Sequence, residues 1–330
     1  MTSPSTRSQQ GVALLMVLIL IVVLALLAAR MSEQFTFNYR KAGRSVALPQ
    51  LRWMLIAAEQ QGMARLQKHF QSKTEAGLVS LAQPWAQPFT LPVGEGNVST
   101  TILSGQNCFN LNSALSFAAP SGNTTPAHAV LQLLLSDYGL NRQKSAKLIT
   151  ELASHLNVGS QKNAAVATQG VSQKSSGADT QQWLLDSKQF KLLPGFETLA
   201  AQPADRWLCV NLDKELAVSI NTLTMQDAPL LAALSLSMLN KQDIGQLLAA
   251  RPEQGWKNIN DISAEINRLW PARKESLQVM LSMLSVNSQN FVIRSQAIIA
   301  GQALVMSSFV HYDTQAKKLA VWKRRYALID

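Results

Sequence analysis

The sequence is poor in the residues from which enzymes and metalloproteins build their sites. Its two cysteines have no metal-ligand spacing, no G-x-S-x-G motif or phosphate-binding loop occurs, and its four histidines form no H-x-x-x-H pair. Those histidines lie far apart, at His69, His128, His155 and His311. We therefore expect no enzyme, no catalytic residue, no metal site and no small-molecule substrate, although a catalytic triad assembled only in space stays open.

Charge is absent from one long stretch near the N-terminus. Val12–Ala29 holds eighteen residues without a charged or hydrogen-bonding side chain, and thirteen of them are Leu, Ile or Val. A helix of that length spans about 27 Å, close to the hydrocarbon core of a bilayer. Inserting those side chains is favourable by roughly 4 to 8 kcal/mol. The stretch predicts a membrane-spanning helix that anchors the rest of the chain.

The flanks of this stretch indicate how it is processed. A cleaved secretory signal ends in an A-x-A-like site, but here Leu occupies the −3 position of either candidate site. The polar leader instead ends at Gly11 and runs directly into the apolar helix, which resembles a prepilin signal. Such a signal is cut after the glycine, so the mature chain would begin at Val12 and keep its helix. Major pilins carry Glu five residues into the mature chain, whereas this chain has Met16 there.

Basic residues outnumber acidic ones, giving a formal net charge of +10 and a pI near 9.8. They are spread along the whole chain, and the densest clusters are Lys317-Lys318 and Lys323-Arg324-Arg325. We interpret most of this charge as solvated surface and not as a nucleic-acid site. Basic residues lie on both sides of the anchor, so they do not settle its orientation.

Cys108 and Cys209 are the only cysteines. An even pair in an exported chain that otherwise lacks cysteine suggests a disulfide. Closing the intervening loop of about 100 residues would be worth about 4 to 5 kcal/mol in the chain-entropy model. Two unrelated buried thiols are the alternative, and the sequence alone leaves both open.

Hydrophobic periodicity outlines the fold beyond the membrane. Apolar residues recur every three to five positions from Leu51 to Phe70, which predicts an amphipathic helix, and Pro49 is expected to break or kink the helix before it. The proline-rich passage 83–89 excludes helix. β-branched residues then predict a strand at 97–103.

The next hundred residues have mainly helical spacing. Apolar residues recur in this way at Val130–Leu135 and Ala146–Leu152, with Gly139 placed as a C-cap between them. Asn157–Gln182 is rich in small and polar residues and predicts a long mobile loop. Helix is expected again from Trp183 to Pro194.

A second helical region precedes the C-terminal strands. Val210–Ile220 predicts a strand, Asn221-Thr222 is expected to cap a helix, and two or three short helices are predicted up to about residue 285. Three strands follow, at 291–299, 304–312 and 319–326. The expected fold is therefore α+β, with a sheet domain that a helical insertion interrupts.

Several motifs resemble the minor pseudopilin K family of bacterial type II secretion systems, and the similarity covers nearly the whole chain. The motifs are Gly11 before an apolar helix without the fifth-position Glu, Ala58-Glu59-Gln60, Cys108-Phe109-Asn110-Leu111-Asn112, Gly177-Ala178-Asp179, Cys209, Ile220-Asn221-Thr222 and the C-terminal strands. The Cys-Phe-Asn-Leu-Asn run and the Asn-Thr turn are fairly specific. The resemblance gives Phe109, Asn110, Asn112, Asn221 and Thr222 a structural role.

The resemblance implies a pilin-like α/β sheet domain, preceded by a long N-terminal transmembrane helix and interrupted by helical, SAM-like insertions. The parts are a prepilin leader (1–11), the transmembrane helix (12–30), the helix extension and first part of the pilin-like domain (31–112), a first helical insertion (113–208), a second helical SAM-like module (209–285) and the C-terminal strands of the pilin-like domain (286–330).

Location and partners are implied in the same way. The family is anchored in the bacterial inner membrane by a single helix, with the bulk of the chain in the periplasm, after a prepilin peptidase removes the leader. It assembles with minor pseudopilins I and J at the pseudopilus tip, where it initiates assembly and supports protein export across the outer membrane. Met16 favours a single copy there, because it gives no carboxylate for the terminal amine of a neighbour.

One departure concerns calcium. The family commonly carries an acidic Asp-x-Asp loop for this ion in its first helical insertion, whereas the corresponding Leu152–Gly159 has no carboxylate. Only Asp179 resembles the family's later ligand stretch. Because calcium takes about six to eight oxygen ligands, we expect a degenerate site and no cofactor.

The alternative function is that of a membrane-anchored nucleic-acid-binding protein, because residues 221–265 resemble a helix-hairpin-helix repeat. Such repeats need a glycine in the hairpin for backbone contact with phosphate. The expected turn here, Met238–Lys241, has no glycine. Packing is therefore the expected role of its apolar residues, and no nucleic-acid partner is expected.

Overall fold

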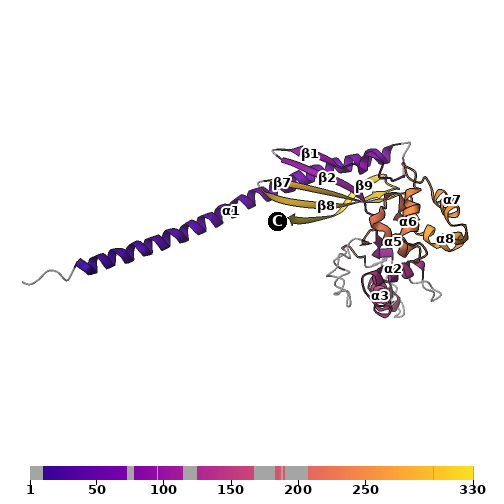
Figure 1. The fold of residues 1–330 in the computed structure, drawn as a ribbon, viewed down its shortest axis with the longest axis horizontal. Coiled ribbons are helices and arrows are strands. Elements are labelled where there is room, and N and C mark those ends of the chain that lie inside the picture. Colours follow the sequence, from indigo (N-terminus) through magenta and orange to yellow (C-terminus); the bar gives the residue numbers. More distant parts are fainter. Residues whose placement is uncertain are drawn as a thin grey trace, which may run out of the picture.

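One long helix extends from the body of the protein in the computed structural model (Figure 1). Helix α1 (Gln10–Gln71) has 62 residues, or about 93 Å at the usual rise. Its first half stands alone, and its second half lies along a β-sheet. Leu14–Tyr39 is the one helical segment of the described chain that is long and apolar enough to cross a membrane. The structure describes residues 10–72, 78–94, 96–113, 125–166, 183–186, 189, 207–299 and 301–329.

Of the break or kink expected at Pro49, the break is wrong, because α1 continues through this residue. A proline inside a helix removes one backbone donor and crowds the preceding turn. Directly after it, however, Leu51, Leu55 and Ala58 are fully buried on one face of the same helix. Burying such side chains is worth about 1.5 to 3 kcal/mol for each of the larger ones. Packing against the sheet therefore offsets the cost of the proline.

A five-stranded antiparallel sheet packs against α1, and together they form the head. The spatial order is β1-β2-β7-β8-β9. The strands are β1 (Phe89–Val93), β2 (Gly96–Ser104), β7 (Asn290–Ile299), β8 (Gln302–Asp313) and β9 (Lys318–Ile329). The chain leaves the sheet after β2 and returns in β7, its antiparallel neighbour. The predicted α+β fold, with a sheet interrupted in sequence, is confirmed.

The passage before the sheet departs from the prediction. Pro84–Ala86 forms a short 3-10 helix, η1, so helix is not excluded from 83–89. Proline is tolerated there because the first helical position has no intrahelical partner for its N–H. Strand β1 was not predicted, and its Pro92 is accommodated because β1 is an edge strand.

Two apolar clusters join α1 to the sheet. One contains Leu55 and Met306 and lies toward the membrane anchor, and the other contains Leu66 and Phe291. Between them along α1 stands Glu59, whose side chain is completely buried. The interface of α1 and the sheet is therefore apolar at both ends and charged in the middle.

The helical insertion has one continuous apolar core. Its described helices are α2 (Pro126–Asp137), α3 (Arg142–Val166), α5 (Ala228–Leu234), α6 (Lys241–Ala249), α7 (Ile259–Leu269) and α8 (Lys274–Ser282). Gly139, with a φ of +83°, ends α2 in the left-handed conformation predicted for a C-cap. Figure 1 shows the insertion at the end of the head away from the anchor.

The helices of the insertion differ from the prediction in extent and in number. Helix α3 extends to Val166, so the first part of the expected loop is helical. The Ala, Gln and Lys residues of this part have good helix propensity, although the segment has few large apolar side chains. The rest of that loop and most of the helix expected up to Pro194 lie outside the described residues, and Trp183–Asp186 is not helical. Between residues 228 and 282 the described chain has four helices, α5 to α8, where two or three were expected; α7 is the one for which no apolar face was recognised.

Two short parallel strand pairs replace the strand predicted for Val210–Ile220. β3 (Phe109–Asn110) pairs with β4 (Leu208–Cys209), and β5 (Val218–Ser219) pairs with β6 (Leu284–Ser285). Residues 210–217 form no strand. Asn221-Thr222 does not cap a helix but lies within the 3-10 helix η5 (Ile220–Thr222). Thr224 instead caps the following 3-10 helix η6 (Met225–Asp227).

Candidate functional site at the junction of the sheet and the insertion

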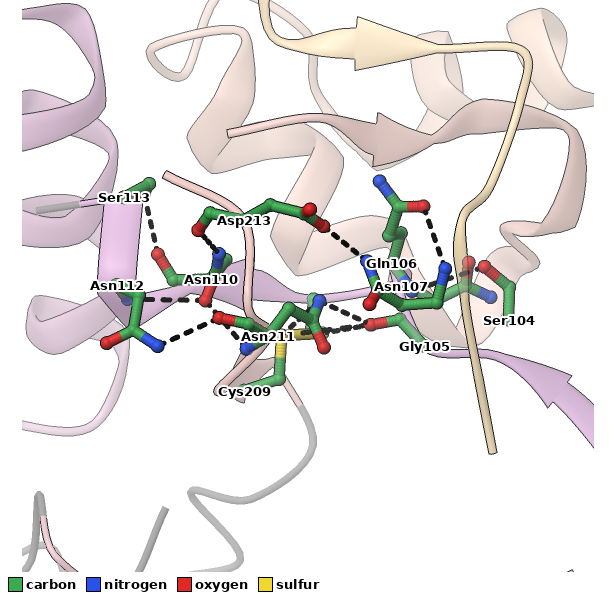
Figure 2. The surroundings of a disulfide bond; sticks show 12 residues. Ser104, Gly105, Gln106, Asn107, Asn110, Asn112, Ser113, Cys209, Asn211 and Asp213 are labelled. Carbon is green, nitrogen blue, oxygen red and sulfur yellow. Dashed lines mark hydrogen bonds between the residues drawn. A yellow bond between two sulfur atoms is a disulfide. The ribbon is translucent and has the colours of Figure 1, made fainter. Parts of the chain in front are cut away.

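The outgoing and returning chains lie side by side where the insertion leaves the sheet (Figure 2). We call residues 104–113 and 207–213 the junction. The outgoing chain forms β3 and the returning chain forms β4, and these strands pair in parallel. Beside this pairing Cys108 and Cys209, 101 positions apart, form a disulfide. Of the two possibilities that the sequence left open, the structure has the bonded pair.

Two buried asparagines hold the crossing chains in register. Asn110 donates from Nδ2 to the carbonyl of Asp213 at 2.7 Å, and its Oδ1 accepts the backbone N–H groups of Asn112 at 3.2 Å and Asn211 at 3.0 Å. Asn211 donates from Nδ2 to the carbonyl of Gly105 at 2.9 Å. A buried amide without partners costs about 1 to 3 kcal/mol. These bonds therefore fix one chain against the other.

Asn112 clamps a third segment to the junction. Its Oδ1 accepts the N–H of Leu184 at 3.0 Å, while its Nδ2 donates to the carbonyls of Leu184 at 2.9 Å and Asn211 at 2.8 Å. The side chain thus pairs with Leu184 as a neighbouring strand would. Asn112 is fully buried, so each of these bonds satisfies a group that water cannot reach.

Gln106 and Asn107 connect the junction to the C-terminal half of the chain. Gln106 donates from Nε2 to the carbonyl of Ala217 at 3.0 Å and accepts the N–H of Gln289 at 2.6 Å. Asn107 donates from Nδ2 to the carbonyl of Thr222 at 2.9 Å and accepts the hydroxyl of the same residue. The predicted motif residue Thr222 is therefore part of the network.

Asn221 performs a similar role inside the helical module. Its Oδ1 accepts the N–H of Trp256 at 2.8 Å, and its Nδ2 donates to the carbonyl of Trp256 at 2.9 Å. Gly255, with a φ of +82°, lies so close that a Cβ there would come within 2.7 Å of the Asn221 side chain. The guanidinium of Arg251 donates to the carbonyl of Asn221 at 3.1 Å, and burial lowers the pKa of Arg251.

The head buries a charge instead of amides. Glu59 on α1 accepts two hydrogen bonds from the Arg324 guanidinium of β9, each 2.7 Å long, and one from the hydroxyl of Ser308 on β8. This bidentate pairing raises the pKa of Arg324. The Arg324 side chain is 42% exposed, whereas Glu59 is completely buried. The pair fastens the edge strand β9 to α1.

Strand β9 also holds the segment that Asn112 clamps. Lys323 and Arg325 contact the carboxylate of Asp186 at 2.6 and 2.9 Å, and Lys323 donates to the carbonyl of Leu185 at 3.1 Å. Because Leu184 is bound to Asn112, residues 183–186 connect the junction to the edge of the sheet. This contact joins the insertion to the head in addition to the junction.

The predicted site residues fall in two separate regions. Cys108, Cys209, Phe109, Asn110 and Asn112 meet at the junction, and Asn221 and Thr222 adjoin it through Asn107. Phe109 differs from its neighbours, because its side chain belongs to the apolar core of the insertion. Gly11 and Val12 lie at the start of α1, away from the junction. Asp179 lies outside the described residues.

Sequence reasoning missed several members of the network. Gln106, Asn107, Asn211 and Arg251 were not singled out. Arg324 was named only within a basic cluster interpreted as solvated surface, whereas it pairs with the buried Glu59. One signal was available: Cys108-Phe109-Asn110 and Cys209-Val210-Asn211 repeat the pattern Cys-x-Asn at the two sides of the insertion. Two crossing chains with matching polar residues could have been inferred from it.

The chemistry of the junction is that of a structural joint. Its functional side chains are mainly uncharged amides with hydrogen-bond partners. Within the described ranges, no three His, Cys, Asp or Glu side chains converge as metal ligands would. The expectation that the chain needs no cofactor stays a prediction.

The helix-hairpin-helix alternative finds no suitable glycine in the described module. The turn between α5 and α6 has Leu236 and Ser237 in the left-handed region, with φ values of 52° and 63°. Gly255, between α6 and α7, is buried against Asn221. Neither turn presents a glycine backbone to a phosphate.

The family model and the related proteins that match this chain carry the same description. A family described as "Type II secretion system (T2SS), protein K" matches residues 218–283. The chain is 28% identical to type II secretion system protein K of Klebsiella pneumoniae, over 97% of both chains. It is 27% identical to the protein of the same name from Aeromonas hydrophila, over 88% of this chain and 89% of the relative.

A solved structure has the same fold. The chain is similar to a chain in the crystal structure of the GspK-GspI-GspJ complex from the type 2 secretion system of enterotoxigenic Escherichia coli, with a TM-score of 0.67 and 21% identity. The likeness covers 87% of this chain and 99% of that one. The resemblance inferred from the sequence motifs is confirmed.

Proposed function

We propose that this chain, a type II secretion system protein K by resemblance, is a minor pseudopilin at the tip of the periplasmic pseudopilus. There it initiates assembly of the pseudopilus and supports the export of proteins across the outer membrane. It is a single-pass protein of the bacterial inner membrane, with its head and insertion in the periplasm.

The proposal rests chiefly on the division of α1 between membrane and head. The most apolar eighteen residues within Leu14–Tyr39 have a mean hydropathy of 2.9, and they are not buried by any other part of the described chain. Farther along the same helix, Leu51 and Leu55 are fully buried against the sheet. One continuous helix is therefore both anchor and core element, so an axial movement of the anchor is transmitted to the head.

The position of the insertion supports a place at the tip. It lies at the end of the head that points away from the anchor (Figure 1). A subunit within a filament must leave that end free for the next subunit, and here the insertion occupies it. Met16 agrees with this reading, because burying the terminal amine of a second subunit beside it would be costly without a carboxylate partner.

Processing and partners follow from the same reading. A prepilin peptidase removes the leader after Gly11, and the oxidising periplasm forms the Cys108–Cys209 bond. The similar chain of known structure was crystallised with GspI and GspJ. The corresponding minor pseudopilins I and J are the partners proposed for this chain.

Cross-linking from position 16 tests this proposal. Both natural cysteines are in the disulfide, so Met16→Cys introduces the only free thiol, and the unsubstituted chain is the control. In cells that express the whole secretion system, we expect adducts with one minor pseudopilin and no self-pairs. Abundant homodimers, or labelled chains along the filament shaft, would contradict a tip position.

A further inference from the structure

A hollow of about 510 Å³ opens beside the junction, within the size range of small-molecule sites. Its lining residues come from segments that are distant in sequence: Gln106 on the outgoing chain, Trp183, part of 212–217 on the returning chain, and part of 285–289 before β7. We call this hollow the junction pocket. Gln106 is 8% exposed and is the one buried residue among those that line it. The pocket therefore lies where the insertion meets the sheet and has a buried base.

The base of the junction pocket is held rigidly. The Gln106 side chain donates from Nε2 to the carbonyl of Ala217 at 3.0 Å, and its Oε1 accepts the N–H of Gln289 at 2.6 Å. Asp213, labelled with Gln106 in Figure 2, accepts a hydrogen bond from the Asn290 amide at Oδ2. Because these side chains are fixed before a ligand arrives, binding does not have to order them. The junction pocket is thus pre-formed.

The walls combine one aromatic ring with hydrogen-bonding groups of both kinds. Trp183 is half-buried and supplies the ring. The carboxylates of Asp213 and Glu215 are acceptors, the ammonium of Lys214 is a donor, and the amide of Asn287 is both. Glu215, Lys214 and Asn287 are exposed, so a ligand can reach them from solvent. A ligand for this pocket must therefore offer donors, acceptors and one flat apolar face.

Three other ligand classes fit these walls poorly. Two carboxylates against one ammonium repel a phosphate or a nucleotide. An organic cation would be repelled by Lys214, whose Nζ already lies 5.9 Å from the centre of the Trp183 ring. A metal ion finds no three converging His, Cys, Asp or Glu side chains in the parts of the chain that the structure describes.

A neutral sugar has the required groups. Each of its hydroxyls can donate one hydrogen bond and accept others, which matches carboxylates, an ammonium and amides in one pocket. Its ring C–H groups form an apolar face that packs on an aromatic side chain such as Trp183. Hydrogen bonds from hydroxyls to carboxylates are charge-assisted and roughly twice as strong as those between neutral groups. The junction pocket therefore has the chemistry of a saccharide site.

We propose that the junction pocket binds an uncharged saccharide, and that in the cell this is the glycan strand of the bacterial cell wall. The choice of glycan rests on the proposed function, which puts the head in the periplasm. Asn290, which holds Asp213, adjoins Phe291. Phe291 belongs to the same apolar cluster as Leu66 of α1, which lies 37 residues, or about 56 Å, beyond Ala29 along the helix. At that height the pocket faces the polysaccharide of the periplasm and not lipid.

The tetramer of N-acetylglucosamine is the probe, because it is an uncharged glycan without peptide. Titration calorimetry of the purified full-length chain, in a detergent that has no sugar headgroup, measures its binding. Trp183→Ala removes the aromatic face and should weaken binding by about tenfold or more, whereas Trp183→Phe should stay within about threefold of wild type. Trp53→Ala is the matched control, because this tryptophan is 72% exposed on α1 and does not line the pocket. It should stay within about twofold of wild type.

Removal of an exposed carboxylate repeats the test without risk to the fold. Glu215→Gln keeps the shape of the side chain but loses its charge, and it should weaken binding by about threefold to tenfold. Glu253→Gln, at an exposed position elsewhere in the insertion, should leave binding unchanged. No saturable binding by wild type, or equal affinity in wild type, Trp183→Ala and Glu215→Gln, would overturn the inference.

A second probe separates glycan from peptide, and cross-linking separates this inference from the proposed function. Wild type should bind isolated cell-wall sacculi, and the free tetramer should compete. Binding only to a stem peptide of the wall would overturn the saccharide assignment. If the tetramer binds but Met16→Cys traps no minor pseudopilin, the proposed function fails and the saccharide site stands. If Met16→Cys traps its partner and no glycan binds, this inference alone is wrong.

Discussion

The head and the junction bury polar groups in two different ways. In the head, one carboxylate, Glu59, is completely buried and is neutralised by Arg324. At the junction, uncharged amides such as Asn110 and Asn112 share many hydrogen bonds beside a disulfide. A buried charge that loses its partner is far more costly than a buried amide that does so. The buried charge in the head is therefore balanced by one ion pair. The junction is held by a covalent bond and by many separate amide hydrogen bonds.

The largest effect is expected from removal of the disulfide. The double variant Cys108→Ser, Cys209→Ser should lower the free energy of unfolding by about 4 kcal/mol, because the bond closes a loop of 101 positions. Urea unfolding of the purified full chain measures this, and wild type treated with reductant should match the variant. A loss below about 1 kcal/mol would mean that the amides alone hold the junction.

Removing Arg324 or Glu59 from the ion pair of the head should lower the free energy of unfolding by unequal amounts. Arg324→Ala leaves Glu59 buried without its counter-ion and should cost about 3 to 4 kcal/mol. Glu59→Ala should cost only about 1 to 2 kcal/mol, since the partly exposed Arg324 can be hydrated. Arg325→Ala is the control, with an expected loss below about 1 kcal/mol. A greater loss from Glu59→Ala than from Arg324→Ala would refute this comparison.

Removing a single side-chain amide of the junction should lower stability less than removing the disulfide or Arg324. Asn112→Ala removes three hydrogen bonds to Leu184 and Asn211 and should cost about 2 kcal/mol. Hydrogen exchange at the amide of Leu184 should become faster. The exposed Asn260→Ala should change stability by less than about 0.5 kcal/mol. Unchanged exchange at Leu184 would show that Asn112 does not clamp that segment.

The smallest effect concerns the turn between β8 and β9. Asp313 accepts the backbone N–H groups of Ala316 at 2.9 Å and Gln315 at 2.8 Å, and these bonds lower its pKa. Its stabilisation is therefore present above the ordinary carboxyl pKa and is lost as the pH falls through the lower folded-state value. The urea midpoint of wild type should fall slightly more between pH 5 and pH 2 than that of Asp313→Asn. Parallel pH profiles would contradict this role.

Local sequence patterns were sufficient to predict the anchor and the long C-terminal strands, but they did not predict the contacts of the junction. The apolar stretch after Gly11 and the alternation in β7, β8 and β9 are visible within a few neighbouring residues. Pro49 misled because its local preference is overridden by burial of the residues after it. Asn110 and Asn211, by contrast, are about a hundred residues apart, and no local pattern specifies which carbonyl a side-chain amide will reach. Only the paired cysteines pointed to that crossing.

Mass spectrometry of the mature N-terminus tests the pseudopilin assignment most directly. In cells with a prepilin peptidase, the chain should begin at Val12 and keep its apolar helix, and Gly11→Leu should block this processing. A wild-type chain that begins at Met1 or after Ala29, or a Gly11→Leu variant that is still trimmed to Val12, would contradict the assignment.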